Sequence, residues 1–173
     1  GIDLPGVHTS DTIMRLEELP ETVVIVGGGF IAAEFATVFT GLGSRVIQVN
    51  RSERLLREHD AQIAERFRRE AARRWDLRTG TEIERIEQGP EGGLQVHLLD
   101  GEGSREAVCA DVVLVATGRR SNADRIGAAE AGLDVRDGVV AVDAQQRVLA
   151  DGRPVTGVWA LGDICSPVQL KHL

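Results

Sequence analysis

A run of β-branched residues that passes directly into three consecutive glycines constrains the fold of this chain more than any other feature. Residues 22–26 form a continuous apolar run, which is typical of a strand buried on both faces. Glycines follow at 27–29, and residues 30–42 have the apolar spacing of a helix that ends at Gly43. A second buried strand is expected at 45–49. This order of strand, turn, helix and strand predicts an α/β fold built on a Rossmann-like βαβ unit.

The glycines have the spacing G-x-G-x-x-(G/A), with Ala32 at the last position. Gly27 permits the tight turn, Gly29 lets the backbone approach a pyrophosphate, and Ala32 keeps the helix close to the sheet. The N-terminus of the helix offers N–H donors and positive partial charge to the diphosphate. A simple tight turn is the alternative interpretation. Because the glycines stand between a strand pattern and a helix pattern, we expect a dinucleotide-binding site.

The residues after the second strand indicate which dinucleotide binds. Sites for NAD usually place Asp or Glu at this strand end, about twenty residues past the glycines, to bind the ribose 2′-OH. Asn50 occupies the position here, and Arg51 and Arg57 follow, with Arg54 between them. Guanidinium groups match the geometry and charge of a phosphate, so two such contacts would favour NADPH over NADH by about a hundredfold or more. The sequence favours NADPH; ordinary surface charge is the alternative.

Two more helices are expected around this unit. A short one lies within residues 10–19, with Ser10 or Asp11 as its cap, and ends before Pro20. A longer amphipathic helix is rich in arginine, and its expected core-facing residues are Ile63, Phe67, Ala71 and Trp75. Its arginines are interleaved with acidic residues, which indicates a solvated outer face; a nucleic-acid contact is the alternative.

Beyond residue 75 the pattern changes to short alternating strands separated by Gly-rich turns, which predicts a small β-meander. The expected strands are 82–87, 94–99, 105–108 and a buried one at 111–116, with shorter ones near 139–142 and 157–161.

Composition excludes several classes of partner. The net charge of −7 argues against nucleic acid, which requires a basic footprint. No apolar run is long enough to span a bilayer, and no signal peptide pattern opens the chain. Cys109 and Cys165 have neither metal-site nor CxxC spacing, and Cys109 is expected to pack as a small apolar residue. We therefore expect a reducing, cytoplasmic setting and no metal.

Three stretches resemble signature segments of the pyridine nucleotide–disulfide oxidoreductase family, the glutathione reductase and lipoamide dehydrogenase type. They begin at Gly27 (GGGFIAAEFA), Val115 (VATGR) and Trp159 (WALGD), in the order and at the spacing of that family. The likeness covers essentially the whole chain. Further stretches at 8–12, 121–124 and 166–172 resemble the mycothione reductase branch of the family more closely than its other branches.

The resemblance implies a division into a connector from an FAD domain (1–20), an NAD(P)-binding domain (21–120) and a partial return into the FAD domain (121–173). It also implies roles for particular residues. Glu34 would lie near the nicotinamide with Ile31 packing close by, and Arg51 and Arg57 would bind the 2′-phosphate, with Asn50 and Phe30 as further contacts of the dinucleotide. The other expected contacts are Gly118 and Arg119 for NADPH, and Gly162, Asp163, Gln169, Leu170 and Lys171 for FAD.

The parent reaction implied by the resemblance is hydride transfer from NADPH to FAD, followed by reduction of a cysteine pair and then of a disulfide substrate, mycothione above others. The family's C-x4-C pair, first FAD-binding unit, dimer-interface domain and catalytic histidine have no counterpart here. We therefore expect a fragment of a homodimeric enzyme, inactive alone, with no catalytic residue of its own. The alternatives are a dihydrolipoyl dehydrogenase, a mercuric reductase, an NADH oxidase or a stand-alone nucleotide-binding module.

Overall fold

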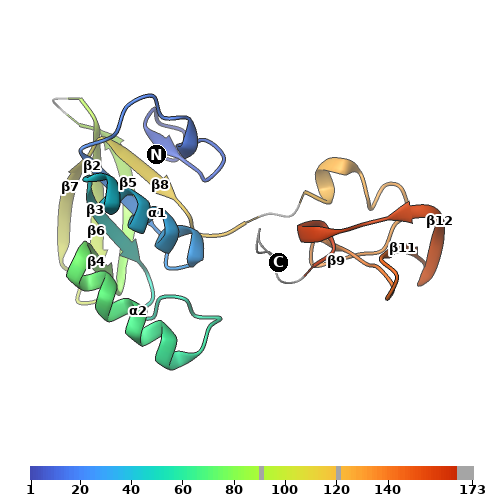
Figure 1. Cartoon of the computed structure of the whole chain (residues 1–173). Helices are drawn as coiled ribbons and strands as arrows, with labels where there is room; N and C mark the ends of the chain where they lie inside the picture. The colour runs from blue at the N-terminus through green and yellow to red at the C-terminus, as the bar shows by residue number, and fades with distance from the viewer. Residues whose placement is uncertain (90–91, 120–121, 167–173) are drawn as a thin grey trace. The chain divides into compact units, whose positions relative to one another are not determined.

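The computed structural model describes residues 1–89, 92–119 and 122–166 (Figure 1). The chain divides into two compact units, Gly1–Gly118 and Arg119–Leu173. The first unit includes residues 1–20, because β1 (Val7–His8) pairs in parallel with a strand of the central sheet. The division into a connector and two domains expected from the sequence stays a prediction.

The centre of the first unit is a five-stranded parallel sheet in the order β1-β8-β2-β3-β4. Val24 lies at its middle, opposite Ile47 on one side and Val113 on the other. The expected strand at 22–26 is confirmed without change, whereas β4 was not expected. The bounds of the remaining strands are β2 (Thr22–Val26), β3 (Arg45–Asn50), β4 (Asp76–Thr79) and β8 (Val112–Val115).

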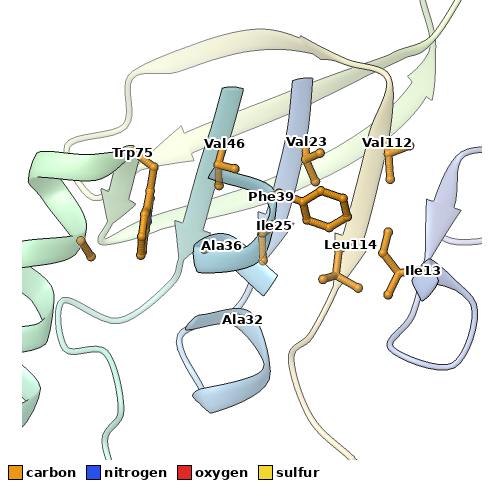
Figure 2. Close-up of a cluster of buried hydrophobic side chains, with 11 residues drawn as sticks. Ile13, Val23, Ile25, Ala32, Ala36, Phe39, Val46, Trp75, Val112 and Leu114 are labelled. Atoms are coloured by element: carbon orange, nitrogen blue, oxygen red, sulfur yellow. The ribbon is translucent and has the colours of Figure 1, made fainter. Parts of the chain in front are cut away.

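Alternate side chains of these strands enter two different cores. On one face, Val23 and Ile25 pack with residues of helices α1 (Phe30–Leu42) and α2 (Ala61–Arg74), as the close-up in Figure 2 shows for α1. On the other face, Val24 packs with Leu94 and Val96 of an antiparallel sheet. That sheet is the expected meander, made of β5 (Thr81–Gln88), β6 (Leu94–Asp100) and β7 (Arg105–Ala110). Burial on both faces explains why β2 and β8 are almost continuously apolar.

The helix α1 has the bounds expected from the sequence, and Gly43 ends it in the left-handed conformation (φ 103°). Of the residues predicted to face the core, Phe67, Ala71 and Trp75 do so, and the prediction was wrong only for Ile63. Ile63 is 59% exposed, and Ala64 is buried instead, together with Ala71 and Trp75. Adjacent helical positions differ by about 100° in direction, and a small alanine gives a weaker sequence signal than isoleucine does.

The expected helix within 10–19 is reduced to one 3-10 turn, η1 (Ile13–Arg15). Neither Ser10 nor Asp11 caps it, because Thr12 is the N-cap residue and makes no side-chain capping bond. The Thr12 hydroxyl instead accepts the Thr9 N–H at 3.2 Å. This local turn chemistry competes with helix formation.

The second unit has a small core of Ala123, Ala128, Val140 and Val148. Two antiparallel pairs surround it, β9 with β10 and β11 with β12. The elements are η2 (Asp124–Ile126), β9 (Val135–Arg136), β10 (Val139–Val140), β11 (Arg147–Ala150), β12 (Arg153–Trp159) and η3 (Gly162–Ile164). No helix in the described ranges is long and apolar enough to cross a membrane.

Candidate dinucleotide-binding site

The turn between β2 and α1 requires glycine at its first position. Gly27 is buried and has a φ of 133°, a conformation that residues with a Cβ rarely adopt. A Cβ placed there would lie 2.5 Å from the carbonyl oxygen of Ala116. The Gly27 N–H donates to the carbonyl of Val49 at 2.8 Å, which ties the turn to β3.

The next two glycines have different surroundings. A Cβ on Gly28 would lie 2.6 Å from the side chain of Asn50, so the loop and the end of β3 are in close contact. A Cβ on Gly29 would meet no atom within 4 Å, and this residue is exposed. The open side of the turn therefore lies at Gly29, where an incoming group can approach the backbone.

The helix α1 begins at this open side without a side-chain cap. Gly29 is its N-cap residue, and the first turn contains no acidic residue. The N-terminus of a helix carries N–H groups without intrahelical partners and a positive partial charge. Ala32, one turn in, is fully buried against the sheet, as the glycine motif predicts. The helix end is thus suited to binding an anion such as a phosphate.

Asn50 ends β3 and organises the loop that follows. Its Nδ2 atom donates to the carbonyl of Ser52 at 2.6 Å and to the carbonyl of Arg54 at 3.3 Å. A carboxylate at this position would have no hydrogen to donate to these carbonyls. The amide therefore shapes the arginine-bearing loop.

The arginine-bearing loop is held against the glycine turn by a backbone hydrogen bond. The N–H of Leu56 donates to the carbonyl of Gly28 at 2.7 Å. Leu56 has a φ of 48°, which places a bulky residue in the left-handed region. Such a conformation costs about 1–3 kcal/mol and persists only where the surrounding contacts maintain it. The bond to Gly28 is one such contact.

Arg51 and Arg57 are exposed, and neither has an ion-pair or hydrogen-bond partner among the described residues. Two other charged groups of the loop are engaged elsewhere. Arg54 donates to the carbonyl of His59 at 2.5 Å, and Glu53 accepts from the Thr79 hydroxyl at 2.9 Å. The two guanidinium groups singled out in the sequence are therefore the ones left available to a ligand.

Gln48 was missed by the sequence interpretation. Its side chain is fully buried, and its Nε2 donates to the carbonyl of Gly27 at 2.9 Å. Its Oε1 accepts from the indole N–H of Trp75 at 2.9 Å. A lone amide within a run of apolar β-branched residues was the available signal, because a buried amide requires partners.

The other residues expected to contact NADPH or FAD lie along α1, at the boundary between the two units and in the second unit. Phe30 and Ile31 are partly buried at the start of α1, and Glu34 is exposed on the same helix. Gly118 closes the first unit and Arg119 opens the second. In the second unit, Gly162 and Asp163 are exposed and form part of η3. The expected FAD contacts Gln169, Leu170 and Lys171 lie outside the described residues.

The described residues include two free cysteines, Cys109 and Cys165. Cys109 is exposed on β7 between buried Val108 and Ala110, so the expectation that it packs as an apolar residue was wrong. Its place in the alternating pattern of the strand turns it outward. Cys165 is also free, and the described residues contain no group of His, Cys, Asp and Glu able to hold a metal ion.

The parallel sheet, the glycine turn and the uncapped helix define an α/β domain of the Rossmann-like class. The model of one family, described as pyridine nucleotide-disulphide oxidoreductase, matches residues 2–172. The chain belongs to this family, whose members use FAD and NAD(P)H.

Relatives and solved structures agree with this assignment. Mycothione reductase of Mycobacterium tuberculosis is 52% identical over 96% of this chain and 34% of its own length. Dihydrolipoyl dehydrogenase of Synechocystis is 32% identical over 99% of this chain and 37% of its own length. The structure of the HOCl-induced flavoprotein disulfide reductase RclA from Escherichia coli matches with a TM-score of 0.77 and 29% identity, over 96% of this chain and 36% of that one. The chain thus spans about a third of the length of these proteins.

Proposed function

We propose that this chain is the NADPH-binding part of an FAD-dependent disulfide reductase. In the whole enzyme, NADPH would reduce FAD, and the reduced flavin would reduce a cysteine pair that reduces the disulfide of a low-molecular-weight thiol. Mycothione is the substrate we favour, because the identity to mycothione reductase is 52%, against 32% to dihydrolipoyl dehydrogenase. A homodimeric parent and the division into nucleotide-binding and FAD-binding segments belong to the same proposal.

The observation that carries the choice of NADPH is the composition of the β3 end. Asn50 stands where an NAD site would have a carboxylate, and Arg51 and Arg57 have no partner among the described residues. The 2′-phosphate of NADPH carries the charge that such guanidinium groups bind, whereas NADH has only a hydroxyl there. The arginine loop and the glycine turn are joined by the bond between Leu56 and Gly28. One dinucleotide can therefore contact both.

The residues of the turn fit the rest of such a cofactor. Open space at Gly29 and the uncapped start of α1 suit a pyrophosphate, which the N–H groups of the helix would bind. We propose that Ile31 and Glu34 border the nicotinamide, that Phe30 contacts the dinucleotide, and that Gly118 and Arg119 also border the cofactor. Gly162, Asp163 and residues 169–171 would contact FAD in the parent enzyme. The bound cofactors supply the hydride chemistry.

The test is a titration of the 173-residue chain with NADPH and with NADH. We expect NADPH to bind at least about a hundredfold more tightly, from two charged contacts to the 2′-phosphate. Replacing both arginines, as Arg51→Ala with Arg57→Ala, should remove most of this preference while NADH affinity changes little. Calorimetry measures both affinities, and the change in their ratio reports selectivity directly.

Arg66→Ala is the matched control, because Arg66 is an exposed arginine of α2 with no partner among the described residues. It removes one positive charge without touching the proposed site, so the preference should persist. Equal binding of the two coenzymes by the unmodified chain would contradict the choice of NADPH. Absence of binding by either coenzyme would contradict the nucleotide-binding role itself.

A further inference from the structure

The side chain of Gln48 is a buried polar group beside the glycine turn. It has no exposed surface, and both ends of its amide are hydrogen-bonded, to the Gly27 carbonyl and to the Trp75 indole, each at 2.9 Å. Burying an amide is unfavourable unless its groups are paired. An apolar residue would fill the same place in an otherwise hydrophobic core without that requirement. We therefore attribute the presence of the amide to its hydrogen bonds and not to the space that it fills.

The direction of the amide is determined by its partners. The indole N–H of Trp75 can only donate, so it must meet the oxygen of Gln48. The Nε2 group then faces the carbonyl of Gly27, which can only accept. Trp75 follows the last residue of α2 and is itself buried, with the guanidinium of Arg74 lying 5.6 Å from its ring centre. The end of α2 is thus linked through one side chain to the glycine turn.

Gln48 and Val49 together hold both polar groups of Gly27. Val49 accepts its N–H at 2.8 Å, and Gln48 donates to its carbonyl. The peptide between Gly27 and Gly28 is planar, and the described residues include no cis peptide bond. In a trans peptide the N–H points opposite to the carbonyl. Because the Gly27 carbonyl faces the buried amide, the Gly28 N–H is directed away from it, and Gly28 itself is only partly buried.

This hydrogen bond matters because glycine lies on both sides of the peptide. Without a Cβ on either residue, a rotated peptide plane is sterically easier than elsewhere in the chain. We infer that Gln48 is a positioning residue for nucleotide binding: it holds the peptide between Gly27 and Gly28 in the orientation that presents an N–H donor to the pyrophosphate. Trp75 keeps the amide of Gln48 in the required direction. This inference rests on the proposed function.

The experiment measures NADP+ affinity of the whole chain at about pH 5.5 and about pH 8.5, a range that spans a raised carboxyl pKa. NADP+ serves as the probe because it survives acid. The variants are Gln48→Leu, Gln48→Glu and Trp75→Phe. The 2′-phosphate itself titrates at about pH 6, which changes NADP+ affinity for every variant. Each affinity is therefore divided by that of the unmodified chain at the same pH. Thermal unfolding at both pH values confirms that each variant is folded.

Gln48→Leu removes the donor, so we expect about three- to tenfold weaker binding at both pH values. Gln48→Glu restores the donor only when the introduced carboxyl group is protonated. Burial raises the pKa of a carboxyl group, so this variant should bind nearly normally at the lower pH and weakly at the higher one. Trp75→Phe keeps a ring but not the N–H, and should weaken binding by about two- to threefold at both pH values.

A merely structural role would weaken Gln48→Glu equally at both pH values, and that result would overturn the inference. Unchanged affinity in Gln48→Leu and Trp75→Phe would overturn it as well, even if Gln48→Glu unfolds at the higher pH. Either outcome leaves the proposed function intact, provided that the unmodified chain binds NADP+. Failure of the unmodified chain to bind contradicts the proposed function instead.

Discussion

The two helices of the first unit pack on the same face of the parallel sheet but begin in opposite ways. At the start of α2, the carboxylate of Asp60 accepts the N–H groups of Gln62 at 2.8 Å and Ile63 at 3.2 Å. At the start of α1, Gly29 offers no side-chain oxygen at all. Every helix N-terminus has the same need for acceptors. A side chain meets that need in α2, whereas no side chain caps α1, where we propose that a phosphate binds.

The segments that precede the two helices also differ in how tightly they are held. The turn before α1 is confined by backbone contacts, with the Gly27 N–H bonded to Val49 and the Gly28 carbonyl bonded to Leu56. The residues before α2 are exposed and charged. The start of α2 has its own cap and does not depend on the conformation of the residues before it. The start of α1 has no side-chain cap, and its position depends on the backbone hydrogen bonds of the glycine turn. Substitutions at the two starts should therefore have different consequences for stability and for binding.

The largest effect is expected at Gly27. In Gly27→Ala, the new Cβ would lie 2.5 Å from the Ala116 carbonyl oxygen, in a backbone conformation with a φ of 133°. We expect the free energy of unfolding to fall by roughly 2–4 kcal/mol and nucleotide binding to be lost. Chemical denaturation and calorimetry measure the two effects. A fully stable variant would mean that the turn is not confined as described.

Gly29→Ala should affect binding without a comparable loss of stability. A Cβ there meets no protein atom within 4 Å, so the free energy of unfolding should fall only by the N-cap preference for glycine over alanine, about 0.5 kcal/mol. The methyl group would occupy the space proposed for the pyrophosphate, and NADPH affinity should fall by about tenfold. Unaltered affinity would show that the phosphate does not approach this residue.

Asp60→Ala reverses that pattern, because it removes the cap of α2. We expect a loss of about 1 kcal/mol in the free energy of unfolding, since two N–H groups lose their acceptor. NADPH affinity should be unchanged. Asp60→Asn, which keeps a side-chain oxygen, is the control and should retain most of the stability. If Asp60→Ala is fully folded but binds NADPH more weakly, the start of α2 also contributes to binding, which would contradict this prediction.

The smallest effect is expected on the solvent-facing side of α2. The guanidinium of Arg68, hydrogen-bonded to Glu65, lowers the pKa of that carboxyl group. A carboxyl group with a lowered pKa in the folded chain stabilises it at neutral pH, and this contribution disappears as the pH falls through that pKa. Glu65→Gln should therefore lower the Tm slightly at about pH 7 and not at about pH 2.5. An equal shift at both pH values would exclude the ion pair as its cause.

The sequence was sufficient for the elements whose signals are local. The strand of β2 and the helix α1 were predicted with their observed bounds, because an apolar β-branched run and a glycine at each end of the helix mark them. The strand β4 (Asp76–Thr79) was missed, since its residues are all half-buried and show neither an apolar run nor alternation. Pairing with β3 places it in the sheet, and that contact is non-local.

The residues of the candidate site are visible in the sequence, but the contacts between them are not. The glycine motif and the arginines after β3 stand out as residue types, and their roles in binding stay predictions. The bond from Leu56 to Gly28 and the amide of Gln48 were not predictable, because both depend on segments that meet only in the folded chain. The left-handed conformation of Leu56 likewise has no signal in its side chain.

The close contact between Gly28 and Asn50 means that these two positions cannot be redesigned one at a time. A Cβ at residue 28 would collide with the amide at residue 50, and the same amide supports the loop that carries Arg51. An attempt to convert coenzyme preference by inserting an acidic residue at position 50 would also disturb the loop beside it. A design meant to reverse the proposed NADPH preference therefore calls for exchanging the glycine turn and the following loop as one cassette.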